Sequence, residues 1–106
     1  MSAYVVAFSP EALEQLEEIF DYIVANATPE IAERYTSSII THCESLKTFP
    51  HGRGTTRDDI RAGLRTTNYK GRTVIAFAVD DEALRVSIVG VFYGGRDYET
   101  LLRSGF

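Results

Sequence analysis

The stretch Leu84–Asp97, LRVSIVGVFYGGRD, decides the fold of this chain. Between Val86 and Tyr93 nearly every residue is apolar and β-branched side chains dominate, which predicts a strand that is covered on both faces. The strand ends at Gly94-Gly95, and Arg96-Asp97 follows either as a charged functional rim or as an ordinary strand end. Regular alternation would give two faces, one with Val86, Ile88 and Phe92 and the other with Val89, Val91 and Tyr93.

Two further strands are expected just before this one. Gly63–Tyr69 alternates with one polar face, which places it toward an edge of the sheet, whereas Thr73–Val79 is continuously apolar. Lys70-Gly71 forms the turn between them. The acidic triplet Asp80–Glu82 is interpreted as the next hairpin turn rather than a metal site, because consecutive residues rarely converge on one ion.

The first half of the chain predicts a short strand, Ala3–Phe8, and then two helices. Ser9-Pro10-Glu11 and Thr28-Pro29-Glu30 both combine a capping hydroxyl, a proline and an acid, which is typical of a helix start. Only about three residues near Asn26–Thr28 remain for the turn, so the helices should form an antiparallel hairpin. Their expected buried faces are Leu13, Leu16, Phe20, Ile23 and Val24 in the first helix, and Ala32, Tyr35, Ile39, Cys43 and Leu46, widened by Ile31 and Ile40, in the second.

The order β-α-α-β-β-β predicts a two-layer α+β fold, with the helical hairpin packed on a small antiparallel sheet. A chain of 106 residues suits one domain over residues 1–106. The segment 51–60, rich in glycine, threonine and charge, should be an exposed loop. The second face of the sheet is only partly coverable by so short a chain, so it must be solvated or bind something.

Charge is unevenly distributed along the chain, whose formal net charge is −4. Residues 1–50 contain eight acidic and two basic residues, whereas residues 53–72 contain six basic and two acidic residues. This asymmetry indicates either a basic face that contacts an acidic partner or a solvated loop and strand edge. The acidic side of the first helix, which includes Glu14, Glu17, Glu18 and Asp21, is expected to be solvated. The longest apolar run, Val74–Val79, is too short to span a membrane, so we expect a cytoplasmic protein.

A set of residues spread over nearly the whole chain matches a known family in order and spacing. They are Phe8-Ser9-Pro10, Ala12-Leu13, Leu16, Ile19, Tyr22-Ile23, Leu46, Phe49-Pro50, Gly52, Gly63-Leu64-Arg65, Tyr69, the strand from Arg72 to Phe77, and Val89 to Asp97. Through them the chain resembles the RelE/ParE superfamily of type II toxin–antitoxin toxins. Gly63-Leu64-Arg65 and Arg96-Asp97 make it more similar to the ParE branch.

The resemblance implies a small toxin that is neutralised by a cognate antitoxin encoded beside it, in a system of the kind that stabilises plasmids. ParE-type toxins poison DNA gyrase, whereas RelE-type toxins cut mRNA on the ribosome. We therefore expect a gyrase inhibitor that acts by binding, with an mRNA endoribonuclease as the alternative. A further alternative is a non-toxic module that only binds its antitoxin.

The candidate catalytic residues of the endoribonuclease alternative are Arg65, Tyr93 and Arg96. Arg65 could neutralise a phosphate, whereas the resemblance places Tyr93, Arg96 and Asp97 where the RelE-like branch has its last-strand catalytic groups. Metal-free RNA cleavage needs a base, an acid and a cation near the phosphate. A tyrosine with a pKa of about 10 is a poor base at neutral pH. Lys47 and Lys70 are the only lysines, and the negative net charge opposes direct binding to nucleic acid. The sequence therefore predicts no convincing active site.

Three other reactive side chains are expected to be structural. Cys43 is the only cysteine and lies on the apolar face of its helix, so it should be part of the core. His42 and Cys43 point about 100° apart on that helix and cannot act as a pair. His51 should be a surface residue. We expect no metal ion and no cofactor. The expected contacts to target or antitoxin are Arg53, Arg57, Arg61, Arg65, Arg72, Arg96 and Asp97, of which Arg65, Arg96 and Asp97 alternatively form ion pairs at the sheet rim.

Overall fold

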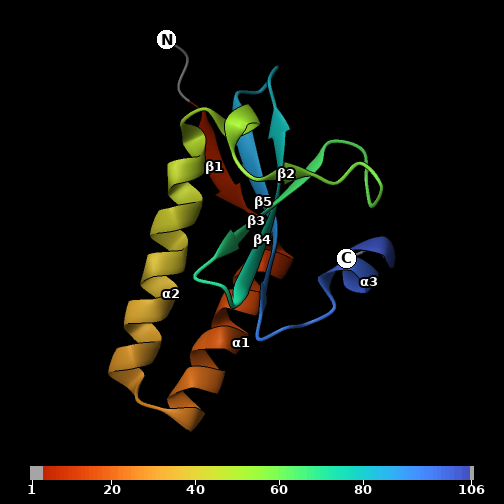
Figure 1. The fold of residues 1–106 in the computed structure, drawn as a ribbon. Helices are drawn as coiled ribbons and strands as arrows, with labels where there is room; N and C mark the ends of the chain where they lie inside the picture. The colour runs from red at the N-terminus through yellow and green to blue at the C-terminus, as the bar shows by residue number, and fades with distance from the viewer. Residues whose placement is uncertain (1–3, 106) are drawn as a thin grey trace.

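The computed structural model describes residues 4–105 and confirms the predicted order of the long elements (Figure 1). The elements are β1 (Val5–Phe8), α1 (Pro10–Asn26), α2 (Pro29–Glu44), the 3₁₀ turns η1 (Ser45–Lys47) and η2 (Pro50–Gly52), β2 (Thr55–Thr56), β3 (Leu64–Tyr69), β4 (Thr73–Asp80), β5 (Arg85–Tyr93) and α3 (Tyr98–Arg103). Ala3, which was assigned to the first strand, lies outside the described residues. The sequence did not predict β2, inside the expected loop, or α3.

The strands form a five-stranded sheet in the order β1-β5-β4-β3-β2, and this sheet is mixed rather than wholly antiparallel. The strands from β2 to β5 pair antiparallel, whereas β1 pairs parallel with β5. The expectation of an antiparallel sheet holds for strands joined by tight turns. It does not hold for β1, because the long connection through both helices leaves its direction free.

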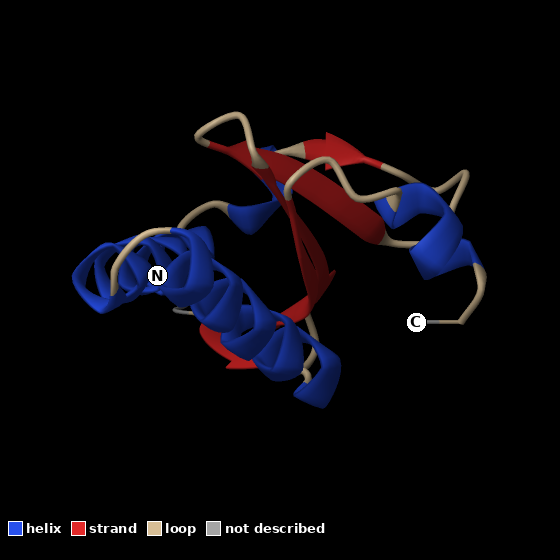
Figure 2. Ribbon diagram, turned by 90° about the horizontal axis from the view of Figure 1, so that it is seen from below, coloured by secondary structure: helices blue, strands red, loops and turns tan. Residues whose placement is uncertain are grey.

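Two hydrophobic clusters lie on opposite faces of the sheet. The larger one is enclosed between the α1–α2 hairpin and the sheet, and it contains fully buried residues such as Ile39, Phe77 and Ile88. The smaller one surrounds Phe92 and Leu102 on the other face, under α3. Figure 2 shows α1 and α2 on one side of the strands and α3 on the other. The second face is therefore partly covered by the chain itself.

A β-bulge changes which side chains of β5 share a face. Ala76 pairs with Gly90 and Phe77 pairs with Ile88, so Val89 has no partner in the register. At this point β5 has one more residue than β4. The extra residue reverses the face of the sheet to which each later side chain of β5 points. Ile88 and Val91 consequently belong to the core beneath the helices, whereas Val89 and Phe92 face α3. The predicted grouping of Val86, Ile88 and Phe92 was wrong beyond this point.

The buried face of α1 also differs from the prediction at two positions. Leu13 is 54% exposed, although its apolar side chain suggested a core position. Gln15 is 4% exposed and takes a place in the buried stripe with Leu16 and Ile19. Ile31 and Ile40, expected to widen the buried face of α2, are both exposed. Within residues 4–105, no helix is long and apolar enough to cross a membrane.

Ser9 joins the start of α1 to the edge of β5. Its hydroxyl accepts a hydrogen bond from the Ala12 N–H at 3.0 Å and donates one to the Val89 carbonyl oxygen at 3.0 Å. Thr28 caps α2 in the same way, because its hydroxyl accepts from the Ile31 N–H, but among residues 4–105 no side-chain hydrogen bond links it to the sheet. The two caps are thus chemically alike and differ in one tertiary hydrogen bond.

We expect Ser9→Ala to lower the free energy of unfolding about twice as much as Thr28→Ala. Loss of a cap costs about 1 kcal/mol, and the lost hydrogen bond to Val89 adds a similar amount. Urea denaturation of the two variants measures the difference, and Ser9→Thr, which retains the hydroxyl, serves as the control. Equal losses in the two alanine variants would mean that the bond to Val89 contributes nothing.

Candidate functional site

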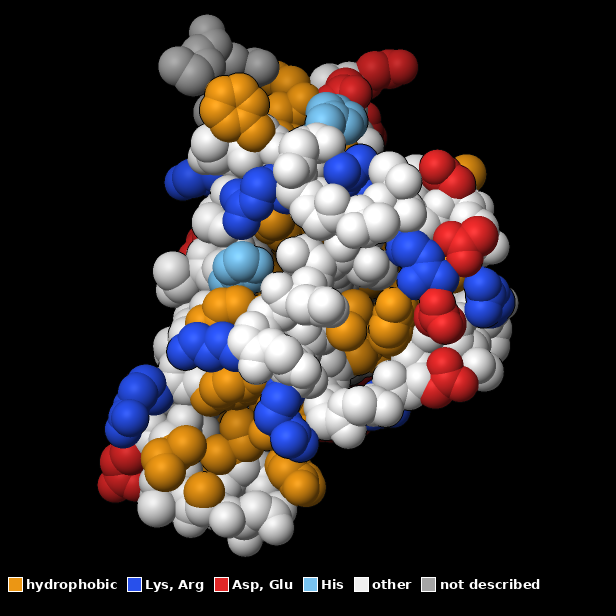
Figure 3. Space-filling view, viewed as in Figure 1, with side chains coloured by type: hydrophobic (Ala, Val, Ile, Leu, Met, Phe, Trp, Pro, Cys, Tyr) orange, Lys and Arg blue, Asp and Glu red, His pale blue; other side chains and the backbone are white. Residues whose placement is uncertain are grey.

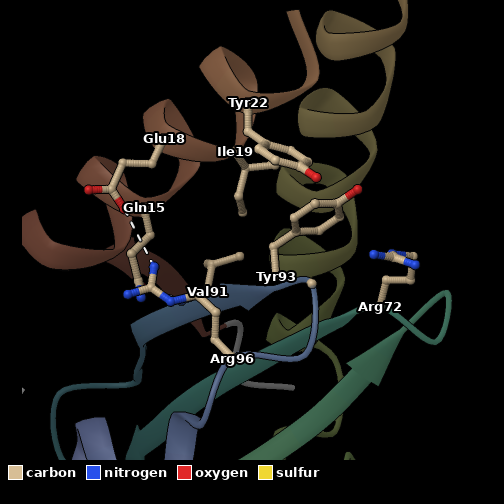
Figure 4. A pocket seen from close by; sticks show the side chains of 9 residues that line it. Gln15, Glu18, Ile19, Tyr22, Arg72, Val91, Tyr93 and Arg96 are labelled. Carbon is tan, nitrogen blue, oxygen red and sulfur yellow. Dashed lines mark hydrogen bonds and ion pairs between the residues drawn. The ribbon is translucent and has the colours of Figure 1, made fainter. Parts of the chain in front are cut away.

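A cavity of about 320 Å³ opens between α1 and the carboxyl end of β5 (Figure 4). Helix α1 contributes polar and aromatic side chains, β5 contributes Val91 and Tyr93, and the segments next to the sheet contribute two arginines. The cavity therefore combines an apolar wall with cationic groups at its rim. Its lining residues are Gln15, Glu18, Ile19, Tyr22, Arg72, Val91, Tyr93, Gly94 and Arg96.

Gln15 enters the core because β5 extends beyond the end of β1. The pairing of β1 ends with Phe8 opposite Ile88, so the backbone of β5 after that point needs other partners. The Gln15 side-chain oxygen accepts a hydrogen bond from the Val91 N–H at 2.6 Å. The bulge and the short β1 thus explain why a polar side chain is buried at the base of the cavity.

Aromatic rings line one end of the cavity. Tyr93 lies edge to face with Tyr22 at 6.0 Å and with Tyr35 at 5.6 Å between ring centroids. The Arg72 guanidinium lies over the Tyr93 ring, 5.6 Å from its centroid, in a cation–π contact. Figure 4 shows Tyr22, Tyr93 and Arg72 together at one end, with Gln15, Glu18 and Arg96 at the other.

Arg96 forms an ion pair with Glu18 across the mouth of the cavity. Their closest nitrogen and oxygen atoms are 3.6 Å apart, and the two side chains are 49% and 68% exposed. An ion pair this exposed stabilises the fold very little, so both side chains remain available to a ligand. Of the predicted contact residues, the structure brings Arg72 and Arg96 together here, beside the candidate catalytic residue Tyr93.

Arg65 and Arg53 lie apart from this cavity and act on the loop that follows α2. The Arg65 Nε donates to the Arg53 carbonyl oxygen at 2.9 Å. The Arg53 guanidinium in turn donates to the backbone oxygen of Ser45 at 2.9 Å and to its hydroxyl at 3.0 Å. These two arginines therefore hold the 45–53 segment against β3, and Arg65 does not line the cavity with Tyr93 and Arg96.

Arg57 and Arg61 hold α3 against the outer face of the sheet. Arg57 donates to both carboxylate oxygens of Asp59, to the Glu99 carboxylate and to the Tyr98 hydroxyl. Arg61 donates to the Leu102 carbonyl oxygen at 3.1 Å. On the face shown in Figure 3, the basic side chains lie in separate small groups, and those beside α3 are mixed with acids. The basic segment 53–72 is thus divided among several structural tasks.

Asp97 caps α3 with both carboxylate oxygens. Oδ1 accepts from the Thr100 N–H at 3.2 Å and Oδ2 accepts from the Thr100 hydroxyl at 2.7 Å. These hydrogen bonds hold the pKa of Asp97 below its usual value. Arg96 and Asp97, which are adjacent in the sequence, consequently serve different elements.

The remaining sequence candidates lie in the core or at the surface. Burial raises the pKa of the Cys43 thiol to about 12, so the thiolate is absent at neutral pH. His51 is exposed and pairs with Asp81 at 2.7 Å. Across residues 4–105, no three His, Cys, Asp or Glu side chains gather closely enough to bind one metal ion.

His42 stacks on Tyr69 with 4.7 Å between ring centroids, and its Nε2 is buried without a hydrogen-bond partner in the part of the chain that the structure describes. Burial and, to a lesser extent, the positive charge of Arg53 lower the pKa of His42 below 6.5. The folded protein therefore binds a proton at this site less readily than the unfolded chain does.

This shift predicts that part of the stability is lost as the pH falls below about 6.5, because the unfolded chain then binds more protons at residue 42. The contribution is fully present above that pH, and the loss ends once the pH passes below the lowered pKa. Urea denaturation near pH 8 and near pH 5 should show a smaller pH dependence for His42→Phe, which retains a stacked ring, than for the unchanged protein. The same pH dependence in both proteins would contradict the assignment to His42.

Among the polar and aromatic residues that line the cavity, sequence reasoning missed three: Gln15, Glu18 and Tyr22. Glu18 was interpreted as part of a solvated stripe, and Tyr22 carried no functional assignment. The sequence signal that could have revealed this site is Gln15, a glutamine at a position where the helical period predicts an apolar residue. A polar side chain on a buried stripe needs a hydrogen-bond partner, and that requirement points to an unpaired backbone group nearby.

Several solved structures that share this fold come from toxin–antitoxin systems. A chain from the chromosomal ParDE system of P. aeruginosa superimposes with a TM-score of 0.74 at 19% identity, covering 87% of this chain and 97% of that one. The RelBE2 toxin–antitoxin complex of Mycobacterium tuberculosis gives 0.65 at 19% identity, covering 91% and 97%. A free-state mutant of the E. coli RelE toxin gives 0.56 at 13% identity, covering 97% and 96%. At these identities the matches establish the fold.

The family itself follows from the sequence of residues 6–98, which matches the description "ParE toxin of type II toxin-antitoxin system, parDE". The match spans most of the chain, so the chain belongs to the ParE toxin family. No curated protein sequence matches the chain significantly. The family match confirms the resemblance to the ParE branch and ends at Tyr98, where α3 begins.

Proposed function

We propose that this protein inhibits DNA gyrase by binding to it through the cavity between α1 and β5. The observation that carries the proposal is the composition of that cavity in a member of the ParE family. Arg72, Tyr93 and Arg96 supply cationic and aromatic groups suited to contact with another macromolecule. A gyrase target would place the protein's action in the cytoplasm.

The arrangement of the candidate catalytic residues favours binding over RNA cleavage. Arg65 donates to the backbone of Arg53 and is absent from the cavity that Tyr93 and Arg96 line. None of the nine lining residues is a histidine or a lysine, and Glu18 is already paired with Arg96. The lining of this cavity therefore offers no histidine or lysine as a general base or acid, which supports a binding role for it.

An antitoxin is proposed as the second partner, because the family consists of toxins from two-component systems. The RelBE2 structure from Mycobacterium tuberculosis, which shares the fold, is a toxin–antitoxin complex. Segments that fold on binding cover large surfaces and use exposed apolar groups. Leu13 and Tyr22 on α1 are 54% and 56% exposed and provide such groups, and Tyr22 is also part of the cavity lining.

The proposal is tested by adding the purified protein to a DNA gyrase supercoiling assay, with and without the antitoxin. Inhibition that the antitoxin relieves is the expected result. An unaffected gyrase together with cleavage of translated mRNA would assign the protein to ribosome-dependent endoribonucleases, with Arg65, Tyr93 and Arg96 to be tested. Normal growth of cells that express the folded protein without antitoxin would instead indicate a non-toxic antitoxin-binding module.

A further inference from the structure

The amide nitrogen of Gln15 makes no hydrogen bond in the part of the chain that the structure describes. The Gln15 oxygen faces Val91, because a backbone N–H can only donate and needs an acceptor. Nε2 therefore points away from Val91, and it has no hydrogen-bond partner among the described residues although the side chain is 96% buried, with 4% exposed. A buried donor without an acceptor is unfavourable, so an acceptor that enters the cavity would gain a ready partner.

The ion pair of Glu18 and Arg96 adjoins this amide at the same end of the cavity (Figure 4). Glu18 supplies a carboxylate to Arg96 from within the chain, at 3.6 Å and with both side chains largely exposed. Exchanging one carboxylate for another at Arg96 costs little, because an exposed ion pair is weak. The Glu18 carboxylate thus indicates that this end of the cavity suits a carboxylate group.

The rest of the cavity suits a side chain with a methylene stem. Ile19 and Val91 are buried apolar residues of the lining, and Tyr22 and Tyr93 add aromatic surface. The volume of about 320 Å³ holds a complete side chain and not only a small ion. A second cation, Arg72, lies at the aromatic end.

We propose that this cavity receives the side-chain carboxylate of a glutamate from the antitoxin. The incoming carboxylate replaces Glu18 as the partner of Arg96, and one of its oxygens accepts a hydrogen bond from Gln15 Nε2. The methylene groups of the glutamate contact Ile19 and Val91. The identity of the partner rests on the proposed function, whereas the carboxylate site rests on the geometry of the cavity.

The charge of α1 favours a protein segment over a nucleic acid as the source of the anion. This helix exposes a row of acids beside the cavity, which would repel a chain of phosphates. A polypeptide can present one carboxylate between neutral or basic residues. The exposed acids of α1 do not repel neutral residues, and they attract basic ones. The exposed acids are Glu11, Glu14, Glu17, Glu18 and Asp21.

Nuclear magnetic resonance of the ¹⁵N-labelled protein tests the site directly. The probes are N-acetylglutamate α-amide, the matching glutamine derivative, N-acetylalanine with its free backbone carboxylate, and inorganic phosphate. The glutamate derivative should shift the Gln15 side-chain amide signals saturably and bind about tenfold tighter than the glutamine derivative. Tighter binding of phosphate would overturn the proposal in favour of a nucleic-acid contact, and tighter binding of N-acetylalanine in favour of a chain terminus.

Two substitutions sharpen the test. Glu18→Gln frees Arg96 and should tighten binding of the glutamate derivative about threefold, whereas Glu14→Gln, the same change at an exposed position outside the cavity lining, should leave it unchanged. Gln15→Glu retains an acceptor for Val91 but replaces the free donor with an acceptor, so binding should be lost. Continued protection of the Val91 amide from hydrogen exchange in this variant confirms that the hydrogen bond and the local fold are intact.

Equal affinity for the glutamate and glutamine derivatives, or weaker binding in Glu18→Gln, would overturn the carboxylate site. The assignment to the antitoxin is tested by measuring antitoxin binding to the same variants. Glu18→Gln should bind antitoxin more tightly than Glu14→Gln. Equal affinities would overturn the assignment to the antitoxin. None of these measurements involves gyrase. A failure of gyrase inhibition with an intact carboxylate response would therefore refute the proposed function alone.

Discussion

Replacing Arg72 and Arg96 together by alanine should raise the concentration needed for half-inhibition of gyrase about 100-fold. A hydrogen bond to a charged group contributes roughly 1.5–3 kcal/mol, and the loss of two such bonds at the lower end of this range gives a factor of this size. Both side chains are exposed, and their contacts in the fold are one cation–π contact and one weak ion pair. The melting temperature of the double variant should therefore stay close to that of the unchanged protein.

A charge-matched control separates a specific contact from a general loss of positive charge. Lys47 and Arg85 are both exposed and lie outside the cavity lining, and Arg85 is at the opposite end of β5 from Tyr93. Lys47→Ala combined with Arg85→Ala removes the same charge and should leave inhibition within about threefold of the original. Equal loss of inhibition in the two double variants would contradict a role for the cavity.

The largest effect on stability is expected for Phe77→Ala. Phe77 is fully buried between the helices and the sheet, and it pairs with Ile88 at the bulge of β5. Truncating a buried phenylalanine costs about 3–5 kcal/mol through lost burial and the cavity that remains. Because small proteins have only about 5–15 kcal/mol of stability, the variant should be close to unfolding.

Phe49→Ala is the matched control, because Phe49 is 81% exposed and the same atoms are removed. Its free energy of unfolding should change by at most about 0.5 kcal/mol. Chemical denaturation of both variants measures the contrast. Similar losses would show that the packing around Phe77 is not what stabilises this face of the sheet.

The long elements were predictable because each has a strong local signal. The two helix starts at Ser9 and Thr28 cap as expected, and the apolar runs 73–79 and 86–93 are strands. The helix α3 was missed because its six residues carry too little periodicity to stand out. Its capping residue, Asp97, was instead assigned to a contact surface.

The candidate site was predictable only in part. Arg72, Tyr93 and Arg96 were selected from their places in the sequence, and the structure brings them to one cavity. Arg53, Arg57 and Arg61 were selected by charge alone and Arg65 also through the family resemblance, and all four form hydrogen bonds within the fold. Charge along a sequence does not reveal which arginines have partners, because those partners come from distant segments such as α3.

The sequence by itself determined the order of the long helices and strands and the antiparallel helical hairpin, since these depend on local periodicity, capping and turn residues, and it indicated the family through a resemblance spread over nearly the whole chain. Only the tertiary structure decided the parallel pairing of β1, the bulge at Val89 and the burial of Gln15. These features arise where backbone groups of β5 lose their strand partners and require acceptors or donors from elsewhere in the chain. Pairing between residues as distant as Gln15 and Val91 leaves no local pattern, so it becomes visible only when the chain is folded.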